Sequence, residues 1–483
     1  MIGRATVVGA GPNGLSAAVL LARAGLEVTV LEATAHLGGA SRTAELLGPG
    51  VVSDVGSAVQ PFAAASPFFS TLPLERHGLR WRHGRYPLGH PLDGRPAAVL
   101  PGNLDEAVAE LGVDGPAWRA LFTGPVRNWE SLVPAVLGPL LRVPTAPLAL
   151  AGFGLRAAWP SAAFVRAVFR DDPARALFSG MAAHALQPHT QPLTAAFGML
   201  FGTAAHTTGW PVPEGGTGAL TRALAAELAE HGGRVLLEHP VRTLTDLGAA
   251  GAADVTLLDL TPRQFLAVAG DELPPRYARA MRRWSYGPAA HKVDYLLDGP
   301  VPWRDPRLAE AVTVHVGGTA AQIAEAEADV VHGRHPQRPF VLVAQQDVAD
   351  PGRAPGGRRV LWAYAHAPHG SADPGTGERV DRQIERFAPG FRDRVLARVE
   401  TPPAALEALD ENLVGGDVGG GALTIRQQVF RPVVGLDPYS TPLEGVYLCS
   451  AATPPGGGVH GMCGFHAASR ALTDLARRRR TGA

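Results

Sequence analysis

The spacing of apolar residues changes twice within the first 32 residues of the chain. A short apolar run at residues 5–8 predicts a buried strand, an Ala/Leu-rich stretch up to Ala24 predicts a helix, and residues 27–31 predict a second strand. The first strand and the helix are joined by Gly9-Ala10-Gly11-Pro12-Asn13-Gly14. Strand, glycine turn, helix and strand form a βαβ unit, which predicts a parallel sheet.

The three glycines of this turn suit the binding of a dinucleotide. Gly9 permits the tight turn, Gly11 lets the backbone approach a pyrophosphate, and Gly14 allows close packing of helix and strand. The N–H groups at the helix start then face the phosphates. Glu32, at the end of the second strand, offers a carboxylate to a ribose diol and would repel a 2′-phosphate, which argues against NADP.

The residues after Glu32 favour FAD over NAD. Gly38, Gly39 and Arg42 bring a second backbone loop and a cation toward the same pyrophosphate. This arrangement resembles the FAD site of the glutathione-reductase-like flavoproteins. No second G-x-G-x-x-G follows a strand, so a separate NAD(P)H domain is not expected.

The rest of the chain alternates between two kinds of pattern. Helix and strand signals at residues 219–231, 234–238, 254–258 and 445–449 continue the cofactor domain, whereas strands such as 291–297 and 359–365 do not fit it. We therefore expect an α/β protein in which a glutathione-reductase-like Rossmann FAD domain is interleaved with an α+β substrate domain. The expected FAD-binding segments are 1–75, 208–272 and 413–483, and the expected substrate-domain segments are 76–207 and 273–412.

Composition narrows the class of protein. The chain has 483 residues, of which 46% are hydrophobic and 18% charged, as in globular proteins of two or three domains. With 44 basic and 44 acidic residues it carries no formal net charge, so nucleic acid is not an expected partner. Two cysteines make no disulfide framework, and the first strand begins too early for a leader peptide. A cytoplasmic protein is expected.

Residues 131–170 contain four arginines and no acidic residue. This segment is a candidate for a membrane-facing surface or for a cap on an apolar substrate tunnel, which would make the protein peripheral on the inner face of the membrane. Helices packed in the interior are the alternative.

The C-terminal stretch GVYLCSAATPPGGGVHGMCGFHAASRAL, residues 445–472, carries a more specific resemblance. Together with the N-terminal unit it resembles the phytoene-desaturase-like flavoproteins, which include carotenoid desaturases, carotenoid ketolases and the PYROXD-type oxidoreductases. Residues 61–100 and 415–432 are most similar to bacterial PYROXD-type members, and the amine oxidases form a more distant branch.

The resemblance implies noncovalent FAD and assigns further contacts to it. It places the Asp54, Gly56 and Ser57 turn under the flavin, and the backbone of Val241 against adenine. Gly457 and Gly458 remove side chains where the ring must approach, and a helix beginning at residues 459–461, with Val459 first, points at the flavin. Amine oxidases carry Gly-Asp or Gly-Glu where this chain has residues 450–453, so Thr453 or backbone is expected to contact the ribityl chain.

Four residues are candidates for chemistry or substrate contact. Lys292 is the only lysine, on a strand that resembles the amine-oxidase strand whose lysine holds a water at flavin N5; a leftover surface lysine is the alternative. His460, in the glycine loop, can act as acid or base or merely shape the cavity. Tyr364 and His366 share one strand face and line the site, or form a core pair. No residue spacing predicts a metal site.

The expected activity is the transfer of a hydride between flavin N5 and a C–H or C=C of an apolar small molecule that is isoprenoid-, polyketide- or lipid-like. Reduced flavin would be reoxidised by O₂ or a quinone. Two alternatives stay open. One is amine-oxidase-type C–N oxidation, which Lys292 favours; the other is an FAD-dependent isomerase or a non-catalytic FAD-stabilised interaction protein.

Overall fold

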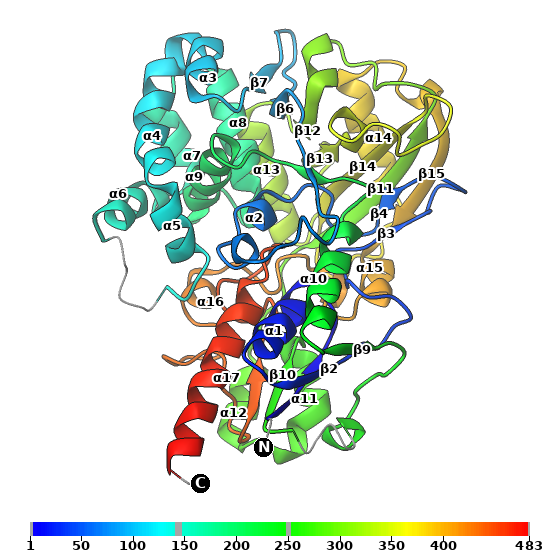
Figure 1. The fold of residues 1–483 in the computed structure, drawn as a ribbon. Helices are drawn as coiled ribbons and strands as arrows, with labels where there is room; N and C mark the ends of the chain where they lie inside the picture. The colour runs from blue at the N-terminus through cyan, green and yellow to red at the C-terminus, as the bar shows by residue number, and fades with distance from the viewer. Residues whose placement is uncertain (1–2, 141–146, 248–252, 482–483) are drawn as a thin grey trace.

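The computed structural model describes residues 3–140, 147–247 and 253–481, which form two domains (Figure 1). The lower domain in Figure 1 holds both ends of the chain and a parallel sheet. The upper domain holds a larger sheet on one side and a layer of helices on the other. The chain passes between the two domains several times, so the colours of Figure 1 are mixed in both.

Five parallel strands in the order β16-β10-β1-β2-β9 form the sheet of the first domain. Their bounds are β1 (Arg4–Val8), β2 (Glu27–Leu31), β9 (Arg234–Leu236), β10 (Val255–Leu258) and β16 (Val446–Leu448). All five lie within the segments expected to bind the cofactor. This parallel sheet confirms the Rossmann-type part of the predicted fold.

Helices cover both faces of this sheet because successive strand residues point to opposite sides. Val7 packs toward α1 (Pro12–Arg23), α10 (Gly218–Glu230) and α17 (Met462–Thr481). Val8 packs toward α11 (Pro262–Ala269) and α12 (Pro275–Met281).

The predicted element ends differ from the observed ones by a few residues. The last helix begins at Met462 and not within residues 459–461, because Gly458 and Gly461 have positive φ angles, +117° and +67°, that an α-helix excludes. The helix expected at 219–231 is Gly218–Glu230, and the strand expected at 234–238 ends at Leu236.

The second domain is built on a seven-stranded sheet in the order β15-β11-β14-β13-β12-β6-β7, in which only the β12–β6 pair is parallel. The bounds are β6 (Tyr86–His90), β7 (Ala98–Leu100), β11 (Ala289–Leu297), β12 (Ala311–Val316), β13 (Val341–Ala344), β14 (Arg359–Ala367) and β15 (Val395–Thr401). On one face, Val293 and Ala363 pack against α14 (Thr376–Phe387). The other face carries Lys292 and Tyr364 and turns toward the first domain.

The helical layer packs around the aromatic core of Trp118, Phe122 and Phe178. It comprises α3 (Leu104–Glu110), α4 (Gly115–Arg127), α5 (Trp129–Val136), α6 (Pro147–Ala157), α7 (Ser161–Val168), α8 (Asp172–Ala182) and α9 (Thr194–Ala205). No single described helix is long and apolar enough to cross a membrane; α6 and α7 together pass by length and composition but are bent by 96°.

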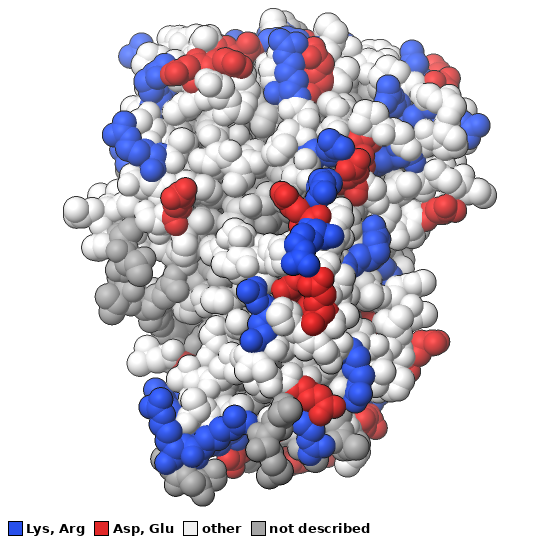
Figure 2. Space-filling view, viewed as in Figure 1, with Lys and Arg blue, Asp and Glu red and all other residues white. Residues whose placement is uncertain are grey.

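The remaining elements are two small two-stranded sheets, three short helices, and α13 (Ala320–Val331), which packs against the large sheet. The small sheets pair β3 (Thr43–Ala44) with β4 (Ser53–Asp54) and β5 (Trp81–Arg82) with β8 (Val212–Pro213), and the short helices are α2 (Pro61–Ala64), α15 (Pro403–Leu409) and α16 (Ile425–Val429). On the face shown in Figure 2, positive and negative side chains are interspersed, apart from an arginine cluster where α17 ends.

A buried ion pair joins the two domains. Arg353, from the link between β13 and β14, contacts Asp54 of β4 at 2.6 Å, and both side chains are at most 1% exposed. Arg353 also contacts Asp350 at 2.8 Å and donates to the Pro213 carbonyl. The other oxygen of Asp54 accepts a hydrogen bond from the backbone N–H of Thr217 at 2.7 Å.

Candidate functional site

One continuous cavity of about 790 Å³ runs from the glycine turn after β1 to the seven-stranded sheet. Fourteen of the sequence-predicted site residues line it: Gly9, Gly11, Glu32, Gly39, Arg42, Gly56, Ser57, Val241, Lys292, Tyr364, Gly457, Gly458, Val459 and His460. Five others do not: Gly14, Gly38, Asp54, Thr453 and His366. We call the two ends of this cavity the dinucleotide end and the sheet end.

The glycine turn at the dinucleotide end has the geometry that its sequence predicts. Gly9 has φ +99°, which favours glycine, and Gly11 is the extended residue before α1. A Cβ on Gly14 would lie 2.0 Å from the carbonyl oxygen of Gly9, so only glycine allows this packing. Gly14 therefore acts through packing and not as a wall of the cavity.

Glu32 and Arg42 reach the same end of the cavity. One Glu32 oxygen accepts from the backbone N–H of Ala10 at 2.8 Å, and the other accepts from the N–H of Thr34 at 3.0 Å. The Arg42 guanidinium donates to the carbonyl of Leu409 at 3.1 Å. Gly38 supports the loop from behind, where its N–H bonds the Ala10 carbonyl.

Two further carboxylates, neither of them predicted from the sequence, lie at the dinucleotide end. Asp259 follows β10 directly opposite Gly9 and accepts a hydrogen bond from the Gly14 N–H at 3.0 Å. A carboxylate oxygen of Asp410 lies 3.0 Å from the position that a Cβ on Gly39 would take. Burial, with the neighbouring Asp410 and Glu32, raises the pKa of Asp259 to about 7. The place of Asp259 at the carboxyl end of a parallel strand was the available signal.

The turn that contains Asp54 is split between two roles. Gly56 and Ser57 line the cavity, whereas Asp54 faces away from it and holds Arg353 and Thr217. Thr453 is also buried behind the wall, with its hydroxyl donating to the Ser450 carbonyl at 2.8 Å. These two side chains therefore support the site from outside the cavity.

His460 presents a neutral imidazole to the cavity. It is 1% exposed, and burial lowers its pKa to about 4. Its Nδ1 accepts a hydrogen bond from the backbone N–H of Met462 at 3.0 Å, so the ring proton resides on Nε2. Nε2 has no hydrogen-bond partner within the described part of the chain. At neutral pH His460 is thus a hydrogen-bond donor and not a charged acid.

Lys292 lines the cavity from β11 and is 2% exposed. Its ammonium forms an ion pair with Asp294. The two residues are two apart on one strand and so share a face, but this pair was not predicted from the sequence. Burial lowers the pKa of Lys292 and raises that of Asp294 to about 6. The surface-lysine alternative is wrong, because Lys292 is buried.

Tyr364 and His366, which were predicted to act together, lie in different surroundings. Tyr364 lines the cavity, but His366 is hydrogen-bonded to Glu327 at 2.7 Å, and both of those side chains are 1% exposed. His366 is therefore a core histidine. His184 also lines the cavity, and its Nε2 lies 3.2 Å from Nε2 of His315; no sequence pattern predicted this residue.

The segment 131–170 forms part of the cavity wall. Val136 and Leu137 at the end of α5, together with Leu150 and Phe153 of α6, line the cavity. The opposite side of α6 is exposed: Leu148 is 89% and Leu155 75% accessible. Arg142, one of the four predicted arginines, lies outside the described residues.

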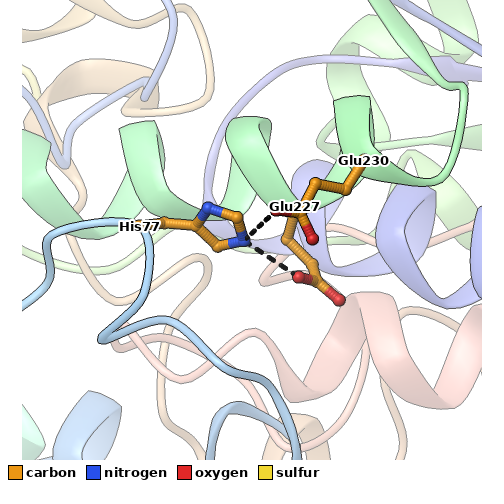
Figure 3. A group of neighbouring side chains, drawn as sticks. All are labelled: His77, Glu227 and Glu230. Carbon is orange, nitrogen blue, oxygen red and sulfur yellow. Dashed lines mark hydrogen bonds and ion pairs between the residues drawn. The ribbon is translucent and has the colours of Figure 1, made fainter.

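His77, Glu227 and Glu230 form a cluster that could hold a metal ion, on α10 and the loop before β5, outside the cavity (Figure 3). His77 Nε2 lies 3.0 Å from one Glu227 oxygen, and His231 lies 3.2 Å from the other. Arg76 lies 3.5 Å from Glu230. This network accounts for the cluster as ion pairs and hydrogen bonds without a metal.

Comparisons with known proteins agree with this architecture. Residues 7–67 match the model of the NAD(P)-binding Rossmann-like domain. The chain is 27% identical to the mouse pyridine nucleotide-disulfide oxidoreductase domain-containing protein 2, covering 98% of this chain and 93% of that protein. Among solved structures, an oxidoreductase from Methanosarcina mazei superposes with a TM-score of 0.62 at 16% identity, covering 97% of this chain and all of the other.

The cyclohexylamine oxidase of Brevibacterium oxydans superposes with a TM-score of 0.60 at 16% identity, covering 99% of this chain and 100% of that one. At such identities the structural likeness describes the fold. Residues 7–67 therefore match a Rossmann-like dinucleotide-binding domain, and the whole chain has the mixed α/β fold of the solved cyclohexylamine oxidase.

Proposed function

We propose that this protein is an FAD-dependent oxidoreductase of the phytoene-desaturase-like, PYROXD-type kind, acting on an apolar isoprenoid-, polyketide- or lipid-like molecule. The observation that carries the proposal is the single cavity that joins the glycine turn and Glu32 to an apolar chamber against the second sheet. A dinucleotide held at one end would have its reactive ring at the boundary between the two domains.

The described residues fit a noncovalent FAD. The glycine turn leaves the backbone open beside the cavity, Glu32 is in place for a ribose, and Val241 lines the same end. Cys463 is fully buried behind the wall, and burial raises the pKa of its thiol to about 12, so it is not a reactive thiolate. These features support noncovalent binding.

When bound, FAD supplies the hydride acceptor for a substrate C–H or, once reduced, the hydride donor to a C=C. The protein's part is to orient the substrate and exclude water. Leu150, Phe153 and Phe201 give the chamber apolar walls, which favour an apolar molecule. His460 offers a neutral N–H, and Lys292 offers the one ammonium in the described part of the cavity wall.

The contacts favour this activity over amine oxidation. A substrate ammonium needs an available carboxylate, but the Asp417 oxygens accept from the N–H groups of Gly287, Gly419 and Gly421. Asp294 is paired with Lys292. Asp294 does not line the cavity, and the other acids that do, Glu32, Asp259, Asp410 and Glu411, belong to the dinucleotide end.

We also propose that the outer side of α6 rests on a membrane surface, peripherally and on the cytoplasmic side. Leu148 and Leu155 project into solvent from the helix whose other side lines the cavity. Two exposed leucines beside an apolar chamber would admit a lipid-like substrate directly from the bilayer.

Replacing Gly11 with valine should abolish FAD binding. The new side chain would enter the cavity beside Asp259, whose oxygen is 3.3 Å from the position of the added Cβ. The FAD content, released by heat and measured by absorbance, should fall from one per chain to almost none. Gly270→Val is the control, because that site has ordinary backbone angles and no atom within 4 Å. Wild-type FAD content in Gly11→Val would contradict the assignment.

FAD affinity should fall as the pH rises through about 7, because Asp259 ionises there and then repels the pyrophosphate. Asp259→Asn keeps an acceptor for the Gly14 N–H but cannot ionise, so its dissociation constant for FAD should vary much less with pH. Fluorescence titration of the apoprotein across this range measures both. An unchanged pH slope in Asp259→Asn would place the titrating group elsewhere.

Lys292→Met should slow the reoxidation of dithionite-reduced flavin by O₂ roughly 100-fold, because a cation near the ring stabilises the superoxide charge as it forms. Arginine should not restore the rate, since its planar fork occupies the space differently. Stopped-flow absorbance measures the rate without any substrate. The double variant Lys292→Met/Asp294→Asn controls for the buried carboxylate that the single change leaves unpaired. A wild-type rate in all three variants would remove Lys292 from the reaction.

Leu148→Glu/Leu155→Glu should lose association with phosphatidylglycerol vesicles, because each buried leucine contributes about 2 kcal/mol to transfer out of water. Co-sedimentation measures the bound fraction. Leu396→Glu is the matched control, since Leu396 is 55% exposed on β15, outside the helical layer. Equal sedimentation of the double variant and the wild type would show that α6 is not the docking surface.

A further inference from the structure

Four strands present one polar face to the sheet end of the cavity. Lys292, Tyr364, Leu342 and His315 are paired in register across β11, β14, β13 and β12. Directly paired residues point to the same side of a sheet. Lys292, Tyr364 and Leu342 all line the cavity, so this part of the face is turned toward it, whereas His315 lies behind the cavity wall.

The next row on the same face contains two hydrogen-bond donors without partners. Trp362 pairs in register with Ala344, and Ala344 pairs with Thr313. Trp362 is 7% and Thr313 1% exposed, and both line the cavity. The indole Nε1 and the Thr313 hydroxyl have no hydrogen-bond partner among the described residues. Only the small Ala344 stands between them in the row.

Unpaired buried donors are unfavourable, so native proteins rarely keep them without a reason. Trp303, on the opposite face of the sheet, shows the ordinary arrangement: its Nε1 donates to Gln345 at 3.0 Å. The two unpaired donors on the cavity face are therefore placed for a group that enters the cavity. An acceptor oxygen at this wall would give a partner to one or the other of these donors.

Apart from Lys292 and Asp294, whose positions pair in register with Tyr364 and Trp362, the other polar groups on this wall are uncharged. Burial raises the pKa of Tyr364, which stays a phenol, and lowers the pKa of His184 to about 3. His184 shares a hydrogen bond with His315 and stacks on Phe201 at 4.2 Å. The two ions of this face, Lys292 and Asp294, are paired with each other, and of the two only Lys292 lines the cavity. Apart from that internal ion pair, the described residues of this wall hold no charge that would neutralise a substrate carboxylate or ammonium.

We propose that Trp362, Thr313, Tyr364 and His184 form a subsite for an uncharged carbonyl oxygen on an otherwise apolar substrate. This donor subsite deepens the proposed function by naming the polar group of its substrate: a ketone, quinone or lactone oxygen. The carbonyl would fix the apolar chain in one orientation, with the donors at one end and the remaining chain along the walls from α6 and α9.

Binding of four matched probes to the holoenzyme tests the subsite: 2-octanone, octane, octylamine and octanoate. Calorimetry gives each dissociation constant and requires no turnover. We expect 2-octanone to bind about tenfold more tightly than octane, as one to two added hydrogen bonds predict, and more tightly than either ion. Equal affinity for ketone and alkane, or tightest binding of an ion, would overturn the proposal.

Trp362→Phe keeps an aromatic ring but removes the N–H, so it should lower the ketone's affinity toward that of octane and leave octane binding unchanged. Thr313→Val removes the second donor at constant shape and should act in the same direction, which keeps the test informative if one variant misfolds. Trp159→Phe is the tryptophan control, because Trp159 is 46% exposed and does not line the cavity. Equal weakening of ketone and alkane in Trp362→Phe would mean that Trp362 only shapes the wall.

The FAD content of each preparation separates this test from that of the cofactor. Colourless protein that still prefers the ketone would overturn the proposed flavin chemistry and support the subsite. Yellow protein with no preference among the probes would overturn the subsite and leave the flavin proposal standing.

Discussion

The close approach of Gly14 to the backbone of Gly9 is the constraint on which the site depends. With a Cβ position only 2.0 Å from the Gly9 carbonyl oxygen, α1 can begin directly above the end of β1 only if residue 14 is glycine. The cavity begins beside this turn, at the carboxyl edge of the parallel sheet. Glu32 at the end of β2 and Asp259 at the end of β10 then reach the same edge, because neighbouring parallel strands end together.

The second domain is held over this edge by the pair of Asp54 and Arg353. Both charges are buried and share further bonds with Thr217 and Pro213, so the loop under the cavity, the start of α10 and the link between β13 and β14 converge at one point. A buried pair of this kind adds geometric definition more reliably than it adds stability, since its desolvation opposes its attraction. Here it fixes the face of the seven-stranded sheet relative to the glycine turn.

The two ends of the cavity differ in electrostatics, and the difference suits a cofactor at one end and an apolar molecule at the other. Acids gather at the dinucleotide end, where Asp259 responds to the charges of Asp410 and Glu32. At the sheet end Lys292 is paired with Asp294, and Trp362 and Thr313 are neutral donors without a partner among the described residues. In a cavity with low-dielectric walls, a hydrogen bond to an unpaired donor is stronger than the same bond in water.

The sequence by itself determined the βαβ unit, its three glycines and Glu32, because these features depend on turn geometry and on residues within one local segment. It also singled out residues 445–472, which the resemblance assigns to FAD, and the one lysine of the chain. Only the tertiary structure decided that Asp54 and Thr453 stand behind the cavity, that His366 belongs to the core, and that Lys292 faces Asp294 inside the protein.

Long-range pairing explains what the sequence could not show. Asp259 meets Gly14 across 245 residues, and Asp54 meets Arg353 across 299. His184 and His315 meet across 131 residues. Local periodicity tells which face a residue occupies on its own strand or helix, but not which distant element covers that face. The partner, and with it the protonation and the role of each side chain, is set by the packing of the two sheets and the helical layer around one cavity.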